Sequence, residues 1–598
     1  MTPSTDHPAL RTALITYIGN KRSLLPLINE GIDACLGRMR GHTAGRPGAA
    51  GETDGRPLRF ADPFTGSGVV SRLARLRGFT AHANDLEVYS RPFGTAFLRT
   101  SPDEIEELFS PIPPLLRTRG LTEPAPTSLF SSASAYTASL EMINTLKEPS
   151  SPTKRYFALH YAPKSTDSPD PERERLFYTR ENALKIDAVL EVIHDTAPSH
   201  REAADILLAS LLVAMSVHNN TSGVMKGFHH GWGGRGGDAL SRILAPITVN
   251  PLPFISGPVG TVTIGDATTV FGSSDAGEFD ICYVDPPYNI HQYGANYHLL
   301  TTATLNDRYD PGPVIRGSRA GIRTDHNRSP YCRRSRATPP ATFPASAKPT
   351  SAAVAFHSFL ESIRCRFLLV SYNNDGIIPA EDLISLLSDN GAAHIDFLTE
   401  DHHKFRGGKN TQSSLTTNEY LFIVDRCTSQ SAGDVERIRA TVEATTHRRS
   451  LTDQYIDPLQ WAAEEKSGSE DRRSTRTSDG WILSSGTREV AYLDRRMRVQ
   501  KLNLTLKTDG AHIEAATIPK TELFDRYLRT QSYEEALYLL RTFKIRKHHH
   551  LFRIVGKVIR ERNRNSVMEG GISRKSSADR ISRAHNVIGA RDLSGQMH

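Results

Sequence analysis

The chain has 598 residues, with 73 lysines and arginines against 66 aspartates and glutamates, a formal net charge of +7 and a pI near 9.0. This length is enough for several domains, and the small basic excess suits a polyanionic partner, with an ordinary solvated surface as the alternative. Five scattered cysteines form no CxxC pair, and no run of about twenty apolar residues or signal-like N-terminus occurs, so we expect a soluble cytoplasmic protein without a metal site.

The first motif is Tyr17-Ile18-Gly19-Asn20-Lys21, an aromatic and glycine turn. It precedes an apolar-periodic helix that we expect to run to about Leu36. Lys21 and the N-terminal amides of this helix are suited to hold a carboxylate, and the alternative is a solvated lysine in the first turn. Residues 41–57 are rich in Gly, Ala and Arg and are expected to form a flexible surface excursion.

A strand, a tight loop and a helix follow in one unit. We expect a strand at Leu58–Ala61, followed by a glycine turn with the sequence Asp62-Pro63-Phe64-Thr65-Gly66-Ser67-Gly68. A helix is expected at Val69–Leu76. Glycines at Gly66 and Gly68 let the backbone approach a ligand, although an ordinary connection is the alternative. The next strand, Gly78–Ala83, leads to Asp85, an acid about twenty positions on that is placed to hold ribose hydroxyls. This spacing fits an adenosine-bearing cofactor.

The most informative motif lies further along the chain. Residues 92–250 carry the helical patterns Asn182–His194 and Ala203–Val217, and Gly265-Asp266 alone is more often a turn than a ligand contact. The apolar run Phe279–Val284 then predicts a buried strand, and it ends in Asp285-Pro286-Pro287-Tyr288.

This tetrad suits chemistry on a flat, weakly nucleophilic amino group. The Asp285 carboxylate and the Pro286 carbonyl can accept amino hydrogens, and Tyr288 offers a face for a flipped-out base. The exocyclic amines of adenine and cytosine are such groups, and this geometry leaves adenine N6 and cytosine N4 both open. Methylation of cytosine C5 is excluded, because it needs a Pro-Cys nucleophile and no cysteine here follows a proline.

Two later segments are candidates to contact DNA. Between Asp310 and Thr350 the chain carries seven arginines among prolines and serines, so we expect a loop that buries no apolar surface and either becomes ordered on DNA or is a solvated linker. The stretch His403–Lys409 mixes cations with an aromatic residue, as a backbone-clamping loop does. The predicted DNA contacts are Arg316, Arg319, Arg323, Lys404, Arg406 and Lys409.

Regular elements resume around and after these segments. We expect a strand at Arg366–Tyr372, a helix at Pro379–Leu387 and a strand at Glu419–Asp425. Beyond residue 430, we expect a polar linker at Ser467–Asp479 and a helix at Glu522–Thr542. A hairpin or meander is expected at Trp481–Leu483 and Arg488–Lys507. No nuclease constellation is evident there, which argues against a fused restriction enzyme.

Together these motifs resemble the Dam-type DNA adenine methyltransferases, in which the cofactor motifs precede a catalytic DPPY motif. The resemblance covers roughly residues 13–426. Tyr17 to Lys21 looks like the family segment that holds the cofactor carboxylate, and Asp62 to Gly68 looks like its glycine loop. Asp85 looks like the acid that binds the cofactor ribose, and Asp266 looks like the element that contacts the cofactor adenine. Asp285 to Tyr288 looks like the catalytic tetrad. Further segments look like those of restriction-modification methylases: Phe177–Thr179 with Asn182–Asp187, Asn220–Val224, Asn289–Tyr293 with Asn296–Leu300, Ser371–Asn374 and Asn418–Phe422. After Val224 the sequence departs from that pattern.

The resemblance implies an α/β, Rossmann-like fold that uses S-adenosylmethionine, with an inserted, mainly helical target-recognition domain and a C-terminal α+β extension. The expected domains are 13–91 and 251–428 for the two parts of the catalytic domain, 92–250 for target recognition, 429–480 as linker, 481–565 as an accessory domain and 566–598 as a disordered tail.

The implied product is N6-methyladenine in double-stranded DNA, made by a monomer that works beside a separate restriction endonuclease or another defence-system subunit. The alternatives are an RNA adenine-N6 methyltransferase and a catalytically silent DNA-binding subunit.

Overall fold

The computed structural model describes residues 5–44, 56–122, 134–234, 237, 239–315, 321–389, 394–403, 416–428, 435–440, 442, 456 and 461, and then 472–477, 480–485, 488–494 and 499–502. The chain divides into two compact units after Arg439.

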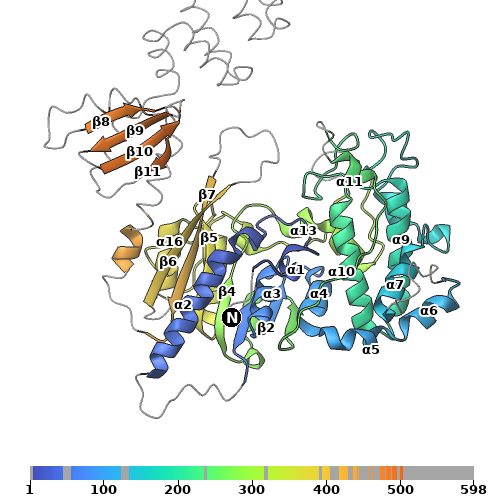
Figure 1. Ribbon diagram of the computed structural model, residues 1–598, viewed down its shortest axis with the longest axis horizontal. Helices are drawn as coiled ribbons and strands as arrows, with labels where there is room; N and C mark the ends of the chain where they lie inside the picture. Colours follow the sequence, from blue (N-terminus) through green and yellow to red (C-terminus); the bar gives the residue numbers. More distant parts are fainter. Residues whose placement is uncertain are drawn as a thin grey trace, which may run out of the picture. The chain divides into compact units, whose positions relative to one another are not determined.

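The first unit is built on a seven-stranded sheet in the order β3-β2-β1-β4-β5-β7-β6 (Figure 1). The strands are β1 Arg59–Asp62, β2 Thr80–Asp85, β3 Thr261–Ile264, β4 Phe279–Val284, β5 Cys365–Asn373, β6 His394–His403 and β7 Thr416–Asp425. Strands β1 to β5 are parallel, and β7 runs antiparallel between β5 and β6. This parallel-rich α/β sheet is the architecture expected of a Rossmann-like methyltransferase.

The parallel strands explain why distant acids meet. Strand β1 ends at Asp62 and β2 ends at Asp85, while Asp285 directly follows the end of β4. Because β1 pairs with both β2 and β4, these three carboxylates emerge at the same edge of the sheet. Ligands of open parallel sheets bind beyond this edge.

Two helices cover one face of the sheet. Helix α2 spans Leu25–Ala44, so it runs beyond the predicted end at Leu36, and α3 spans Val69–Leu76 as predicted. Apolar side chains of both helices share one core with β1, β4, β5 and β7. Residues 45–55 of the predicted surface excursion lie outside the described residues. Three other helices, α12 Ala267–Gly272, α15 Ser351–Ser362 and α16 Ala380–Asp389, pack in sequence, α12 on α15 and α15 on α16.

A helical region gathers on the side of the sheet where β3 and β2 lie (Figure 1). Its helices are α4 Ser90–Gly94, α5 Ile105–Phe109, α6 Ile112–Thr118, α7 Ala135–Asn144, α8 Tyr156–His160, α9 Arg180–Thr196, α10 Arg201–Val217 and α11 Leu240–Leu244. Helices α9 and α10 confirm the two helical patterns of this region. One apolar core joins them to Tyr89 and to Tyr297, which lies between α13 Tyr293–Asn296 and α14 His298–Leu305.

The arginine-bearing segment after α14 differs from the prediction. Tyr331 and Cys332 are buried in a short 3-10 helix, Pro330–Cys332, which packs on α15. The expectation of a loop that buries no apolar surface is therefore wrong for residues 321–350, because neighbouring elements supply the burial that its own composition lacks. Residues 316–320 lie outside the described residues.

The second unit contains an antiparallel sheet in the order β11-β10-β9-β8. Its strands are β8 Arg472–Arg476, β9 Gly480–Ser485, β10 Arg488–Asp494 and β11 Val499–Leu502. This confirms the predicted meander and adds β8, which lies in the stretch interpreted as a linker. The predicted helical segment Glu522–Thr542 and tail 566–598 fall outside the described part. Among the helices that the structure describes, none is long and apolar enough to span a bilayer.

Candidate active site

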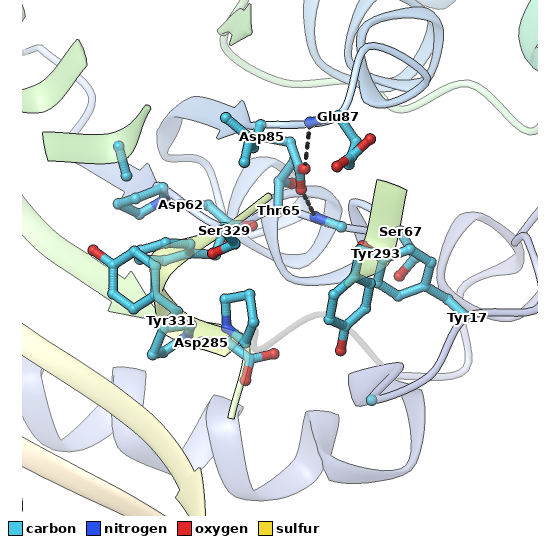
Figure 2. Close-up of a pocket in the computed structure, with 18 of the residues that line it drawn as sticks. Tyr17, Asp62, Thr65, Ser67, Asp85, Glu87, Asp285, Tyr293, Ser329 and Tyr331 are labelled. Atoms are coloured by element: carbon cyan, nitrogen blue, oxygen red, sulfur yellow. Dashed lines mark hydrogen bonds between the residues drawn. The ribbon is translucent and has the colours of Figure 1, made fainter. Parts of the chain in front are cut away.

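One cavity lies beyond the carboxyl ends of β1, β2 and β4. Its walls contain the predicted catalytic and cofactor residues Tyr17, Gly19, Asn20, Lys21, Asp62, Phe64, Gly66, Ser67, Asp85, Asp266, Asp285, Pro286, Pro287 and Tyr288. Of the predicted set, Gly68 alone lies behind the wall, in an adjoining small cavity with Arg72. Figure 2 shows Asp85 and Glu87 on one side of the cavity, Tyr17 and Tyr293 on another, and Asp285 below them.

The glycine loop adopts a conformation that needs glycine. Gly66 and Gly68 have φ angles of +52° and +78°, and a Cβ on Gly66 would lie 2.8 Å from the ring of Tyr17. The buried guanidinium of Arg72 donates to the Ser67 carbonyl at 3.2 Å and to the Ala9 carbonyl at 3.1 Å. The backbone of the loop therefore faces the cavity. On the other side of the loop, Arg72 of α3 holds it through these hydrogen bonds.

Asp85 is tied to this loop and to its own strand end. One carboxylate oxygen accepts from Gly66 N at 2.7 Å and the other from Glu87 N at 2.9 Å (Figure 2). Because each carboxylate oxygen can accept a second hydrogen bond, Asp85 can still bind hydroxyls. Burial raises the pKa of Asp85 to about 6, and burial together with Asp85 raises the pKa of Glu87 to about 8. Glu87 was missed by the sequence analysis, although it stands only two positions after Asp85.

Tyrosines join the first motif to the segment after the tetrad. The Tyr17 ring stacks on Tyr297 at 4.7 Å and lies 5.1 Å from Tyr293. The Tyr297 hydroxyl accepts from Ile18 N at 2.6 Å, and the Tyr293 hydroxyl donates to the Ile18 carbonyl at 3.3 Å. These contacts fix Tyr17 and Tyr293 against one side of the cavity.

Lys21 is buried rather than solvated. It is 3% exposed, and its ammonium lies 3.1 Å from Asp285, 3.7 Å from Glu419 and 5.0 Å from the centre of the Tyr288 ring. Burial alone would lower the pKa of Lys21, but Asp285, Tyr288 and Glu419 raise it overall, so the ammonium stays charged. The alternative of a solvated first-turn lysine is therefore wrong.

The tetrad is held by the strand that follows it in the sheet. The Tyr288 carbonyl accepts from Ile377 N at 2.9 Å, and the Tyr288 ring meets Tyr372 edge-on at 5.8 Å. A Cβ on Gly19 would lie 3.2 Å from the Tyr288 hydroxyl, so that turn also packs against it. Burial raises the pKa of Asp285 to about 6, against the opposing effect of Lys21.

Residues of the arginine-bearing segment form an outer wall. Ser329 exchanges two hydrogen bonds with the side chain of Gln292, at 2.8 and 3.2 Å, and the Tyr331 ring meets Phe64 edge-on at 5.1 Å. Ser329, Pro330 and Tyr331 line the cavity beside Asp266 and Phe64. The amino-acid composition of this segment did not predict that its residues would line the cavity.

The structure lends no support to a DNA contact by Arg323. Its side chain is 2% exposed, and its guanidinium pairs with Asp307 at 2.6 Å and Asp325 at 2.7 Å. Such a doubly paired guanidinium anchors the segment instead of facing a phosphate. Arg316, Arg319, Lys404, Arg406 and Lys409 lie outside the described residues.

The described lining is acidic. Five carboxyl groups, Asp62, Asp85, Glu87, Asp266 and Asp285, face the cavity beside one ammonium, Lys21. Burial raises the pKa of Asp62 to about 7. The described residues contain no cluster of three or more His, Cys, Asp or Glu side chains suited to a metal ion.

Comparison with known proteins shows which family part of the chain resembles. Residues 257–311, which include β3, β4, the tetrad and α14, match the model of the D12 class N6 adenine-specific DNA methyltransferases. This match, together with the curated relatives, supports assignment of the chain to the D12 class of N6 adenine-specific DNA methyltransferases. The description of the matched family favours the adenine amino group over N4 of cytosine as the methyl acceptor.

Curated relatives extend the likeness over a larger part of the chain. The chain is 26% identical over 420 residues to the type II methyltransferase M.CviAII of Paramecium bursaria Chlorella virus 1, covering 69% of this chain and 98% of the relative. It is 28% identical over 260 residues to M.NlaIII of Neisseria lactamica, covering 42% and 68%. It is 24% identical over 413 residues to the StsI modification methylase of Streptococcus sanguinis, covering 69% and 52%. No solved structure matches the chain significantly.

Proposed function

We propose that this D12 methyltransferase transfers methyl groups from S-adenosylmethionine to adenine N6 in double-stranded DNA at the cavity described above. One observation carries the proposal: the Asp285 tetrad and the Gly66 loop, which are far apart in the sequence, line the same cavity. An electrophile and a nucleobase must meet for methyl transfer, and this cavity has walls suited to both.

The lining fits a cationic adenosine compound. Its carboxylates complement the sulfonium and ammonium groups of S-adenosylmethionine, and Asp85 is placed for the ribose hydroxyls. Gly66 and Ser67 offer backbone to the donor, while Phe64, Asp266 and Tyr331 would hold its adenine. When bound, the donor supplies an electrophilic methyl group.

The tetrad would prepare the target amine. Asp285 and the Pro286 carbonyl accept the N6 hydrogens, and the Tyr288 ring stacks on the flipped base. N6 uses its lone pair for the new carbon–nitrogen bond, the electron pair of the broken bond stays on sulfur, and one N6 proton leaves toward the Asp285 carboxylate. No covalent enzyme intermediate is needed, so catalysis rests on placement and electrostatics.

DNA would approach across the outer wall. Arg328, Arg333 and Arg334 are exposed and flank the wall residues Ser329–Tyr331, and the described residues give none of the three a carboxylate partner. Arginines in such a position suit phosphates beside a flipped nucleotide. We therefore propose these three arginines as DNA contacts instead of Arg323. The other predicted contacts stay predictions: Arg316, Arg319, Lys404, Arg406 and Lys409.

The helical region would read the target sequence. Its loop Asn219–Met225 touches the segment after the tetrad, where Met225 N donates to the Asn296 carbonyl at 2.7 Å and the His298 ring lies 2.8 Å from the Met225 carbonyl. This contact supports the proposal, because it joins the region to the segment that follows the tetrad. The relatives named type II methyltransferases and modification methylases support a role in restriction-modification. We propose a separate endonuclease as the partner in that role.

A matched pair of variants tests the proposal. Asp285→Asn and Asp280→Asn make the same change on one segment, but Asp280 lies toward the start of β4, where it accepts from Arg59 N at 2.9 Å. The purified chain should form N6-methyladenine in unmethylated duplex DNA only when S-adenosylmethionine is added, as measured by nucleoside mass spectrometry. D280N should stay active and D285N should lose activity. Methylation of structured RNA but not DNA, or an active D285N, would refute the assignment.

A further inference from the structure

We propose that Glu419 is a positioning residue for methyl transfer, which acts on the Asp285 carboxylate by sharing the Lys21 ammonium with it. The inference rests on the proposed role of Asp285 as acceptor of the adenine amino hydrogens. Glu419 itself is not among the residues that line the cavity, so it would act through Lys21.

The topology explains how Glu419 reaches the site. It lies near the beginning of β7, and β7 is antiparallel to β5. The start of an antiparallel strand lies at the edge where its parallel neighbours end, so Glu419 pairs in register with Asn373, the last residue of β5. Its other registered neighbour is Glu400 of β6.

Among the residues that the structure describes, the charges of this group do not balance. Two carboxylates, of Asp285 and Glu419, approach one ammonium at 3.1 and 3.7 Å, and the side chains of Lys21 and Glu419 are 4% and 6% exposed. Buried charges without compensation are costly, so an excess carboxylate here requires a reason. A site that develops positive charge on N6 supplies one, because the net negative group stabilises that charge.

Other groups also face Asp285. Lys21 reaches it from the first helical turn and Glu419 from β7. Asp285 in turn raises the pKa of four neighbouring groups on β1, β4, the tetrad and α13, which are Asp62, Tyr283, Tyr288 and Tyr293. Asp62 is already bound by Ser71 on α3. Glu419 is thus the carboxylate that contacts the same ammonium as Asp285 and opposes its effect.

Neutralising Glu419 has a predictable sign. Glu419 raises the pKa of Asp285, whereas Lys21 lowers it. With glutamine in place of Glu419, Lys21 would act on Asp285 alone, so the carboxylate would become less basic. The acid limb of the pH–rate profile should then move to lower pH, and the plateau rate should fall because a weaker acceptor activates the amine less.

The test is single-turnover methylation of duplex DNA by the full chain carrying Glu419→Gln, measured from pH 5 to pH 8. We expect the midpoint of the acid limb to fall by about one pH unit and the plateau rate to fall about tenfold. The affinity for sinefungin, an amine analogue of the donor, should change less than twofold. An unmoved midpoint would overturn the inference, because a purely structural role lowers the active fraction equally at every pH.

Two further variants separate charge from packing. Asp425→Asn makes the same neutralisation at the other end of β7 and should leave the midpoint unchanged. Glu419→Asp keeps the charge, so its midpoint should stay at the wild-type value even if its rate falls. Should E419Q fail to fold, a shifted midpoint in E419D would still refute the inference. Absence of methylation by the wild-type chain would instead refute the proposed function itself.

Discussion

Lys21 Nζ lies 3.1 Å from Asp285 Oδ1, which joins the first motif of the chain to the catalytic tetrad by a buried ion pair. The helical turn Lys21–Leu24 begins after Asn20, whose side chain accepts from Arg22 N at 2.9 Å. This cap fixes the backbone from which Lys21 reaches across to the end of β4. The predicted role of Lys21 toward the donor carboxylate stays untested, but its ammonium clearly acts on Asp285.

Removing this ammonium should shift the pH dependence in the direction opposite to E419Q. In Lys21→Met, Asp285 and Glu419 lose their shared cation, so the pKa of Asp285 rises and the acid limb of the rate profile moves to higher pH. The single-turnover rate at pH 7 should fall about a hundredfold. Lys21→Arg keeps the charge and should hold the midpoint within a few tenths of a pH unit. Identical midpoints in K21M and the wild type would contradict this electrostatic link.

The acidic lining predicts a pH-dependent donor affinity. Burial and the neighbouring Asp85 raise the pKa of Glu87 to about 8, so its ionisation between pH 7 and pH 8.5 adds negative charge to the cavity. The Kd for the cationic sinefungin should therefore decrease as pH rises through this range, while that for neutral S-adenosylhomocysteine should change less. Glu87→Gln should flatten the sinefungin curve. Calorimetry at a series of pH values measures both, and equal slopes in E87Q and the wild type would refute the assignment.

The same carboxyl group links ligand-free stability to pH. Since its folded-state pKa lies above its ordinary value, its contribution to stability is complete at low pH and is lost as pH rises through about 8. E87Q should lose less thermal stability than the wild type between pH 7 and pH 8.5.

Local patterns predicted the part of the site that neighbouring parallel strands build. The apolar run Phe279–Val284 and the glycine turn at Gly66 each indicate a strand end, and parallel pairing brings such ends together whatever their distance in sequence. That is why Asp62, Asp85 and Asp285 could be assigned to one cavity before their contacts were known.

The rest depends on tertiary order that no local pattern carries. Strand β6 was not predicted. Nothing in the sequence Glu419–Asp425 indicates that this strand lies between β5 and β6 in the sheet. The approach of Glu419 to Lys21 therefore could not be predicted. The composition of its segment suggested that Arg323 would be free to contact DNA. In the structure its side chain is buried and forms ion pairs with Asp307 and Asp325.

The exposed arginines of the outer wall should contribute to DNA affinity through phosphates. Replacing Arg328, Arg333 or Arg334 with alanine should weaken binding severalfold on any sequence and reduce the slope of log K against log salt by about one for each phosphate that is no longer neutralised. Sinefungin affinity should not change. Arg364→Ala is the matched control, because Arg364 is exposed at the start of β5, at the opposite edge of the sheet. Slopes equal to wild type in all three variants would rule out this path for DNA.

The last prediction concerns the glycine loop. Alanine at Gly66 would meet two penalties, a φ of +52° that costs about 1 kcal/mol or more and a Cβ only 2.8 Å from the Tyr17 ring. The loop or Tyr17 must then move, and Gly66 N would lose its alignment with Asp85. We expect the Kd of Gly66→Ala for sinefungin to rise about tenfold or more, with a lower melting temperature.

Gly37→Ala is the matched control for this change. Gly37 is exposed in α2, where an added Cβ meets nothing within 4 Å. Alanine at that position should raise stability by about 0.5–1 kcal/mol through helix propensity and leave sinefungin binding unchanged. Equal donor affinity in G66A and G37A would mean that the close approach of loop and tyrosine does not shape the donor site, since both variants add the same methyl group and only one adds it there.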